Sequence, residues 1–134
     1  MPTEPGGDME IPKTVLICDD KFMNRKLVIA MLTGLPYQVI EATCGQDCLQ
    51  RMDTAGDTVD IILLDISMKD INGIDVCREL RNKPYGAHIP IVAYTANAMS
   101  GERAKFIEAG FNEVLIKPIV EEELLLVLDR LLAI

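Results

Sequence analysis

The sequence lacks the features that would direct it to a membrane or to an anionic polymer. No apolar run approaches the ~20 residues needed to span a bilayer, and the opening stretch MPTEPGGDMEIP lacks the basic and apolar regions of a signal peptide. Basic residues are outnumbered, since 13 Lys and Arg stand against 21 Asp and Glu and the net charge is −8. We therefore expect a cytoplasmic protein in which this segment contacts neither nucleic acid nor membrane.

Ligands for zinc are also scarce. The only histidine, His88, lies in a loop where we expect it to be solvated. Cys44 and Cys48 are four residues apart, but no second pair completes a zinc site. We therefore expect the four cysteines to be reduced and mostly buried.

What is present fits one folded domain. The chain has 134 residues, of which 49% are hydrophobic and 25% are charged, a usual composition for a globular domain that buries a core. The first dozen residues are rich in Pro, Gly and acid. We expect a flexible linker or tail over residues 1–12 and a single domain over residues 13–134.

A short apolar run followed by a segment with helical spacing occurs five times. This alternation predicts a parallel sheet covered by helices on both faces. The fourth helical segment is expected to begin at a Ser100 cap and to end at Gly110. The apolar runs are KTVLIC, YQVIEA, VDIILL, IPIVAY and NEVLI. The residues expected to face inward are Met23, Leu27 and Met31 in residues 21–33; Cys48, Leu49 and Met52 after Gly45; Ile74, Cys77 and Leu80 from Gly73; and Leu124, Leu128 and Leu131 in the last segment.

Polar residues end four of the five predicted strands. Asp19 and Asp20 end the first strand, Asp65 the third, Thr95 the fourth and Lys117 the fifth. Taken singly, an Asp after a strand is most often a turn former or a helix cap. However, the carboxyl ends of strands in an open α/β sheet form the crevice where ligands bind. Their joint occurrence at these ends therefore favours a functional site.

The chemistry of this set points to phosphoryl groups. Three adjacent carboxylates repel one another unless a cation lies among them, and ligands that are all oxygen suit Mg²⁺ or Mn²⁺. Lys117 and Thr95 would provide a positive charge and a hydroxyl donor for an anion. Because a carboxylate can attack phosphorus and form an aspartyl phosphate, the set predicts a metal-dependent phosphoacceptor.

The sequence resembles the receiver domains of two-component response regulators over nearly its whole length, from VLICDD to the last helical segment. The most specific pieces are the adjacent aspartates, ILLD followed by NG at 72–73, the Thr of AYTANAM, and KPI at 117–119. The intervals from Asp65 to Thr95 and from Thr95 to Lys117 also match the family's usual spacing. The resemblance implies an α/β fold, a three-layer αβα sandwich with a five-stranded parallel sheet of order 2-1-3-4-5, flavodoxin-like (CheY-like).

The same resemblance implies roles for the acidic residues. Asp65 would be the phosphoacceptor, taking a phosphoryl group from a phosphohistidine on a histidine kinase or a phosphotransfer domain. Asp20 and Asp65 would bind Mg²⁺ directly, Asp19 largely through water, and the backbone carbonyl of Ser67 would complete the protein ligands. The domain would catalyse its own phosphorylation and dephosphorylation, and would not be a conventional turnover enzyme.

The resemblance also implies a switch. Lys117 would hold a phosphoryl oxygen, and its bond to Pro118 would be cis. Thr95 would move towards the phosphoryl group and pull its loop along, so that phosphorylation biases two preexisting conformations. A dimer through the fourth helix, fifth strand and fifth helix would be one output.

Some residues depart from the family pattern or border the site. Lys69 stands where the family usually has Pro, which puts the rigidity of this loop in question. Val114 stands where an aromatic switch residue is usual, so we expect Tyr94 or Phe111 to contribute differently, if an aromatic takes part. Ser67 and Asn97 are expected to border the phosphoryl group and to tune its lifetime.

Several alternatives remain open. The stretches DDKFMNRKLVIAML and YTANAMSGERAKFIEAGFNEVLIKPI resemble receivers of hybrid sensor histidine kinases. We therefore expect a receiver excised from such a kinase, which would place it in the cytoplasmic part of a membrane-anchored protein; a free-standing response regulator is the alternative. A pseudo-receiver that only binds partners would be expected to lack an acid, the Thr or the Lys. A phosphohydrolase would carry Asp-x-Asp after the first strand, and a flavin protein would carry a phosphate loop that DDKFMNR does not provide.

Overall fold

The computed structural model describes residues 11–96 and 101–132. Ser100 and Asn97, and most of the predicted linker, lie outside these residues. Strands and helices alternate along the chain, as the sequence predicts. The elements are β1 (Lys13–Cys18), α1 (Phe22–Leu32), β2 (Tyr37–Ala42), α2 (Gly45–Ala55), β3 (Ile61–Asp65), α3 (Gly73–Arg81), β4 (Ile91–Thr95), α4 (Glu102–Ala109), β5 (Glu113–Ile116) and α5 (Glu121–Leu132), with 3-10 turns at Gly56–Thr58 and Pro84–Gly86.

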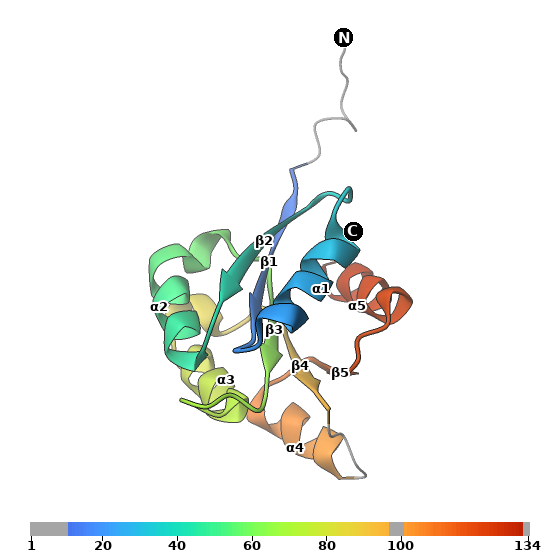
Figure 1. Cartoon of the computed structure of the whole chain (residues 1–134). Coiled ribbons are helices and arrows are strands. Elements are labelled where there is room, and N and C mark those ends of the chain that lie inside the picture. The colour runs from blue at the N-terminus through green and yellow to red at the C-terminus, as the bar shows by residue number, and fades with distance from the viewer. Residues whose placement is uncertain (1–10, 97–100, 133–134) are drawn as a thin grey trace.

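The five strands form one parallel sheet in the order β2-β1-β3-β4-β5, which confirms the predicted topology. Helices α1 and α5 cover one face, and α2, α3 and α4 cover the other (Figure 1). Successive side chains of a strand point to opposite faces. In β3, Ile62 and Leu64 therefore pack towards α2, α3 and α4, whereas Ile61 and Leu63 pack towards α1 and α5. The central strand is apolar throughout because both of its faces are buried.

The inward face of α1 differs from the prediction. Met23 is 73% exposed and Leu27 is 42% exposed, while the buried residues of the helix are Arg25, Val28 and Leu32. The segment carries apolar residues at helical spacing on two faces, so periodicity alone did not identify the face that docks on the sheet. Of the predicted stripe, only Met31 packs partly against the core.

The other helices bury the predicted faces. Cys48, Leu49 and Met52 of α2 are buried, as are Cys77 and Leu80 of α3. In α5 the buried residues are Leu124, Val127 and Leu128, with Leu131 partly buried. The predicted end of α4 is confirmed by Gly110, whose φ of +117° favours glycine. His88 is exposed, and the four cysteines are free thiols.

In the part of the chain that the structure describes, no helix is long and apolar enough to cross a bilayer.

Candidate functional site

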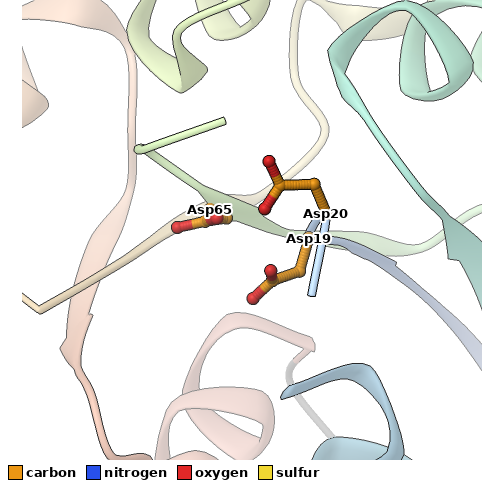
Figure 2. Close-up of side chains that lie close together, drawn as sticks. All are labelled: Asp19, Asp20 and Asp65. Atoms are coloured by element: carbon orange, nitrogen blue, oxygen red, sulfur yellow. The ribbon is translucent and has the colours of Figure 1, made fainter. Parts of the chain in front are cut away.

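The carboxyl ends of β1 and β3 bring three acidic side chains together. Cys18 of β1 pairs with Leu64 of β3, so the residues that follow each of them lie at the same edge of the sheet. Asp19, Asp20 and Asp65 each place one carboxylate oxygen within 4.8 Å of the others (Figure 2). Asp19 is 0% exposed and Asp65 is 1% exposed. The predicted convergence of the three acids is therefore present.

Lys117 and Thr95 join this cluster from the neighbouring strands. The Lys117 ammonium lies 2.9 Å from Oδ1 of Asp65 and 3.5 Å from Oδ2 of Asp19. Thr95 is buried at the end of β4, and its carbonyl oxygen accepts a hydrogen bond of 2.8 Å from the Lys117 backbone N–H. The Lys117–Pro118 bond is cis, as the resemblance implied. All five residues thus lie at one edge of the sheet, and Thr95 is joined to the cluster through its backbone bond to Lys117.

The cluster holds more negative charge than its protein partners offset. Burial raises the pKa of the Asp65 carboxyl, the Lys117 ammonium opposes that rise, and the Asp19 carboxylate adds to it. Among the described residues, Oδ2 of Asp19 and Oδ1 of Asp20 are buried oxygens that accept no hydrogen bond. Buried carboxylate oxygens without a donor fit a hard divalent cation.

The loop after Asp65 is tied to the acidic cluster by its backbone. The N–H of Ser67 donates to Oδ1 of Asp65 at 3.3 Å, and the N–H of Lys69 donates to Oδ2 of Asp20 at 3.1 Å. A proline at position 69 has no N–H and could not make the second bond. Lys69 therefore gives the loop a link that the usual family residue lacks, while the residue as a whole is exposed.

Asp70 ties the same loop to the start of α2. Its carboxylate accepts hydrogen bonds from the backbone N–H groups of Gly45 at 3.0 Å and Gln46 at 2.8 Å. Burial alone would raise the pKa of Asp70, but these bonds hold it at about 2. Further along, Gly73 approaches the strand end so closely that a Cβ there would lie 2.3 Å from the Asp65 carbonyl oxygen. The loop is thus anchored at both of its ends.

Arg25 supports the acidic turn, and sequence reasoning did not identify it. Its Nη1 donates to the carbonyl oxygen of Asp19 at 3.0 Å, and its Nε donates to Oε1 of Glu41 at 2.9 Å. Because the Asp19 carbonyl belongs to the peptide that joins Asp19 to Asp20, Arg25 fixes the orientation of that peptide. The signal available in the sequence was Glu41, the partner of Arg25, which is a charged residue near the otherwise apolar end of YQVIEA.

The remaining predicted residues lie in different environments. Val114 is buried in the layer that contains α2, α3 and α4. Phe111 stacks edge-on against Phe106 in the same layer, with ring centroids 5.9 Å apart. Tyr94 lies on the other face, and its ring centroid is 4.6 Å from the Lys117 ammonium. Of the two aromatic candidates, Tyr94 is therefore the one that contacts the site.

Comparisons with known proteins point to one family. Residues 15–129 match the response regulator receiver domain family. The chain is 34% identical over 117 residues to the signal transduction histidine-protein kinase BarA of Escherichia coli (strain K12), a match that covers 87% of this chain and 12% of that protein. It is 40% identical over 105 residues to the response regulator PleD of Caulobacter vibrioides (strain NA1000 / CB15N), covering 78% of this chain and 23% of that protein.

A solved structure supports the same assignment. The receiver domain of a sensor histidine kinase from Pseudomonas aeruginosa PAO1 superimposes with a TM-score of 0.79 at 32% identity, covering 92% of this chain and 99% of that one. That crystal structure has a magnesium ion coordinated in the active site cleft. The chain spans only 12% of BarA and 23% of PleD, so the likeness concerns one module of each protein. On the sequence match, the sheet order and the structural match together, this chain belongs to the receiver domain family of two-component response regulators.

Proposed function

We propose that this receiver accepts a phosphoryl group on Asp65 from a phosphohistidine of a histidine kinase or a phosphotransfer domain. The observation that carries the proposal is the position of the Asp65 carboxylate. It is buried at the end of a central strand, 2.9 Å from the Lys117 ammonium and beside two further carboxylates. A nucleophile, a cation for the phosphoryl oxygens and a set of metal ligands thus meet at one point.

Asp19, Asp20 and Asp65, together with the Ser67 carbonyl, would hold Mg²⁺ or Mn²⁺. The two carboxylate oxygens without hydrogen bonds support this assignment, because a buried acceptor needs a partner. When bound, the ion supplies positive charge that offsets the three carboxylates and the oxygens of an incoming phosphoryl group.

The transfer forms one bond and breaks another. An oxygen of Asp65 attacks the phosphorus, the O–P bond forms, and the P–N bond to the donor histidine breaks. The electron pair of that bond stays on the imidazole nitrogen, which is left neutral once the ring holds one solvent-derived proton. Lys117 moves from the Asp65 carboxylate to a phosphoryl oxygen, and the Thr95 hydroxyl donates to another. Thr95 and its loop thereby shift between two preexisting conformations.

An exposed apolar face beside the crevice supports a protein as phosphoryl donor. Helix α1 starts two residues after Asp20, and its Phe22, Met23 and Leu27 are all exposed. Lys26 lies 5.1 Å from the Phe22 ring centroid and adds positive charge to this face. Grouped apolar side chains on a surface mark an interaction site, and we assign the donor domain to this one.

The wider context is also part of the proposal. Similarity to BarA favours a receiver excised from a hybrid histidine kinase, with residues 13–134 as the domain, residues 1–12 as a linker and the whole in the cytoplasm. A free-standing single-domain response regulator is the alternative. The exposed Ile107, Ile116 and Leu126 support a dimer through α4, β5 and α5. Ser67, Lys69, Asn97 and Val114 would tune the phosphoryl lifetime.

Mass spectrometry after incubation with Mg²⁺ and acetyl phosphate tests the proposal. We expect a Mg²⁺-dependent gain of one phosphoryl group in the wild type and in the matched control Asp75→Asn, and none in Asp65→Asn. Asp75 suits the control because it is exposed and contacts only Arg78, at 3.8 Å, among the interactions described. Lys117→Ala should lose the conformational response even where it is phosphorylated. A folded wild type that gains no phosphoryl group, or an Asp65→Asn variant that does, would refute the proposal; the first result would favour a pseudo-receiver.

A further inference from the structure

Tyr94 is a buried polar residue at the site to which the proposed phosphoryl transfer gives no role. It precedes Thr95 in β4 and is only 2% exposed. It pairs with Asp65 in the β3–β4 register, and its carbonyl oxygen accepts a hydrogen bond of 3.3 Å from the Ile66 N–H. Its backbone is therefore held next to the phosphoacceptor on one side and the switch threonine on the other.

The ring of Tyr94 lies against the Lys117 side chain. The ammonium is 4.6 Å from the ring centroid, while it also contacts Asp65 at 2.9 Å and Asp19 at 3.5 Å. An ammonium over an aromatic face is attracted to it, and more strongly where water is excluded. The Lys117 side chain is 20% exposed. The ring therefore packs against the Lys117 ammonium on one side and helps to hold it between the carboxylates of Asp65 and Asp19.

The Tyr94 side chain lies close to the acidic cluster, because its ring contacts the lysine that pairs with Asp19 and Asp65. Burial raises the pKa of Tyr94, and the Asp19 carboxylate raises it further, followed by Asp65. A tyrosine hydroxyl in its ordinary neutral form can donate a hydrogen bond. Oδ2 of Asp19 is a buried acceptor with no hydrogen bond in the described part of the chain. An aliphatic residue at position 94 could support neither Lys117 nor Asp19 in this way.

We propose that Tyr94 is a positioning residue of the phosphoryl site, whose ring seats the Lys117 ammonium between Asp65 and Asp19 and whose hydroxyl orients the Asp19 carboxylate. The inference rests on the proposed function, since both supported groups act there on a phosphoryl group or a metal. Val114 cannot provide these contacts, because it packs in the layer on the opposite face of the sheet. Binding of a metal or a phosphoryl group by Asp19 and Lys117 would therefore affect β4 directly, through the contacts of Tyr94.

Two variants separate the ring from the hydroxyl. Tyr94→Phe keeps the ring and removes the donor, whereas Tyr94→Leu removes both. Tyr85→Phe is the matched control, because Tyr85 also faces a carboxylate, with its hydroxyl 2.7 Å from Oδ1 of Asp53, but lies far from the crevice in the layer around α2. Mg²⁺ affinity is measured by calorimetry, and the rate of phosphorylation is measured against acetyl phosphate concentration.

We expect Tyr94→Phe to weaken Mg²⁺ binding about tenfold, the usual size for loss of a group that orients a metal ligand, and to leave the maximal rate of phosphorylation nearly unchanged. Tyr94→Leu should weaken Mg²⁺ binding to the same extent. It should also lower the maximal rate of phosphorylation about tenfold, because the ring that positions Lys117 is lost. Tyr85→Phe should change neither. A second readout is tyrosine fluorescence, which the chain offers without interference because it has three Tyr and no Trp. Phosphorylation should change the emission of the wild type and of Tyr85→Phe, but not that of Tyr94→Phe.

The outcomes separate this inference from the proposed function. If the wild type is phosphorylated on Asp65 while both Tyr94 variants match it in Mg²⁺ affinity and rate, the inference is overturned and the proposed function stands. A lower unfolding temperature with unchanged affinity and rate would show a packing role only, and would also overturn it. A wild type that neither binds Mg²⁺ nor becomes phosphorylated would overturn the proposed function, and the Tyr94 inference with it.

Discussion

Arg81 and the acidic cluster lie at opposite ends of the sheet, and they differ in how completely their polar atoms are hydrogen-bonded. At the amino ends of β4 and β5, the Arg81 guanidinium makes five hydrogen bonds of 2.6–3.0 Å, all to neutral oxygens. At the carboxyl ends, Lys117 pairs with Asp19 and Asp65 and Lys21 lies 3.6 Å from Asp20, yet two oxygens of the three carboxylates accept no hydrogen bond. The oxygens that Arg81 binds are the carbonyls of Gly86, Ile89 and Gly110 and Oδ1 of Asn112.

The difference separates a stabilising cluster from a ligand site. Arg81 satisfies carbonyls that no helix or strand partner reaches, so it holds the loops around β4 and β5 in place. The acidic crevice leaves two buried carboxylate oxygens without a hydrogen bond, which costs stability. Under the proposed function, a bound cation would remove this cost. Substitutions at the two clusters should therefore change stability in opposite directions.

The largest effect is expected at the satisfied end of the sheet. Arg81→Met keeps the length of the side chain and removes all five hydrogen bonds, so it should lower the free energy of unfolding by about 3 kcal/mol. Urea unfolding measures this loss. Arg78→Met on the same helix is the control and should stay within about 0.5 kcal/mol, because Arg78 makes only an exposed ion pair of 3.8 Å with Asp75. Equal losses in both variants would contradict the comparison.

The next effect concerns the support beneath the acidic turn. Arg25→Lys can bind Glu41 or the Asp19 carbonyl, but a single ammonium lacks the fork that reaches both. Mg²⁺ binding should weaken about tenfold, or about 1.4 kcal/mol, while the fold remains. Lys26→Met is the control, since Lys26 shares Glu41 with Arg25, at 3.0 Å, and lies over the Phe22 ring, but makes no described contact with the Asp19 carbonyl. Calorimetric titration would refute the assignment of Arg25 if both variants bound Mg²⁺ like the wild type.

A smaller effect of opposite sign is expected at Asp65. Without metal, Asp65→Asn removes one of the crowded carboxylates and should raise the free energy of unfolding by about 1 kcal/mol. Because burial raises the pKa of Asp65 above its usual 3.8, this group favours the folded state most below that pH, and the benefit is lost as the pH rises through the raised pKa. The gain from the variant should therefore grow towards neutral pH. Urea unfolding in the presence of a chelator, from about pH 4 to about pH 7, measures this gain. A variant that was less stable than the wild type throughout this range would contradict the comparison.

The smallest effect is expected at Asp70, whose two carboxylate oxygens both accept hydrogen bonds, so that it resembles Arg81 in being fully paired. Its pKa of about 2 lies below the usual 3.8, so its contribution to stability is present above 3.8 and is lost as the pH falls through about 2. Asp70→Ala should cost about 0.5 kcal/mol at neutral pH, because the carboxylate is exposed and screened by solvent. The cost should vanish in strong acid. A loss that persisted there would show that the charge is not its cause.

The fold could be predicted from the sequence because its signals are local. Each strand is a short apolar run, each helix has a buried face, and Gly110 marks the end of α4. The face of α1 was the exception, since Met23 and Leu27 repeat at the same spacing as the buried Val28 and Leu32. Tertiary packing decides between two such faces, and spacing along the chain does not.

Of the residues that form the site, the sequence allowed only those at the strand ends to be predicted. Asp19 and Lys117 directly follow a strand and Asp65 is the last residue of one, so topology alone brought them together. The support of Arg25 could not be derived, because it depends on a contact between α1 and the end of β2. Nor did the sequence show that the backbone N–H of Lys69 binds Asp20, since a lysine in a loop is most simply a solvated charge.

The residues of the crevice are drawn from strands spread over almost the whole chain, from Asp19 to Lys117. A ribosome makes the acids of β1 and β3 early and the lysine after β5 late. A nascent chain therefore carries Asp65 long before it carries the ammonium that pairs with it. The strand that precedes this ammonium is also at the edge of the sheet, next to β4 alone. Under the proposed function, a chain interrupted before Lys117 would therefore hold the acids of the site without the cation that the transfer uses.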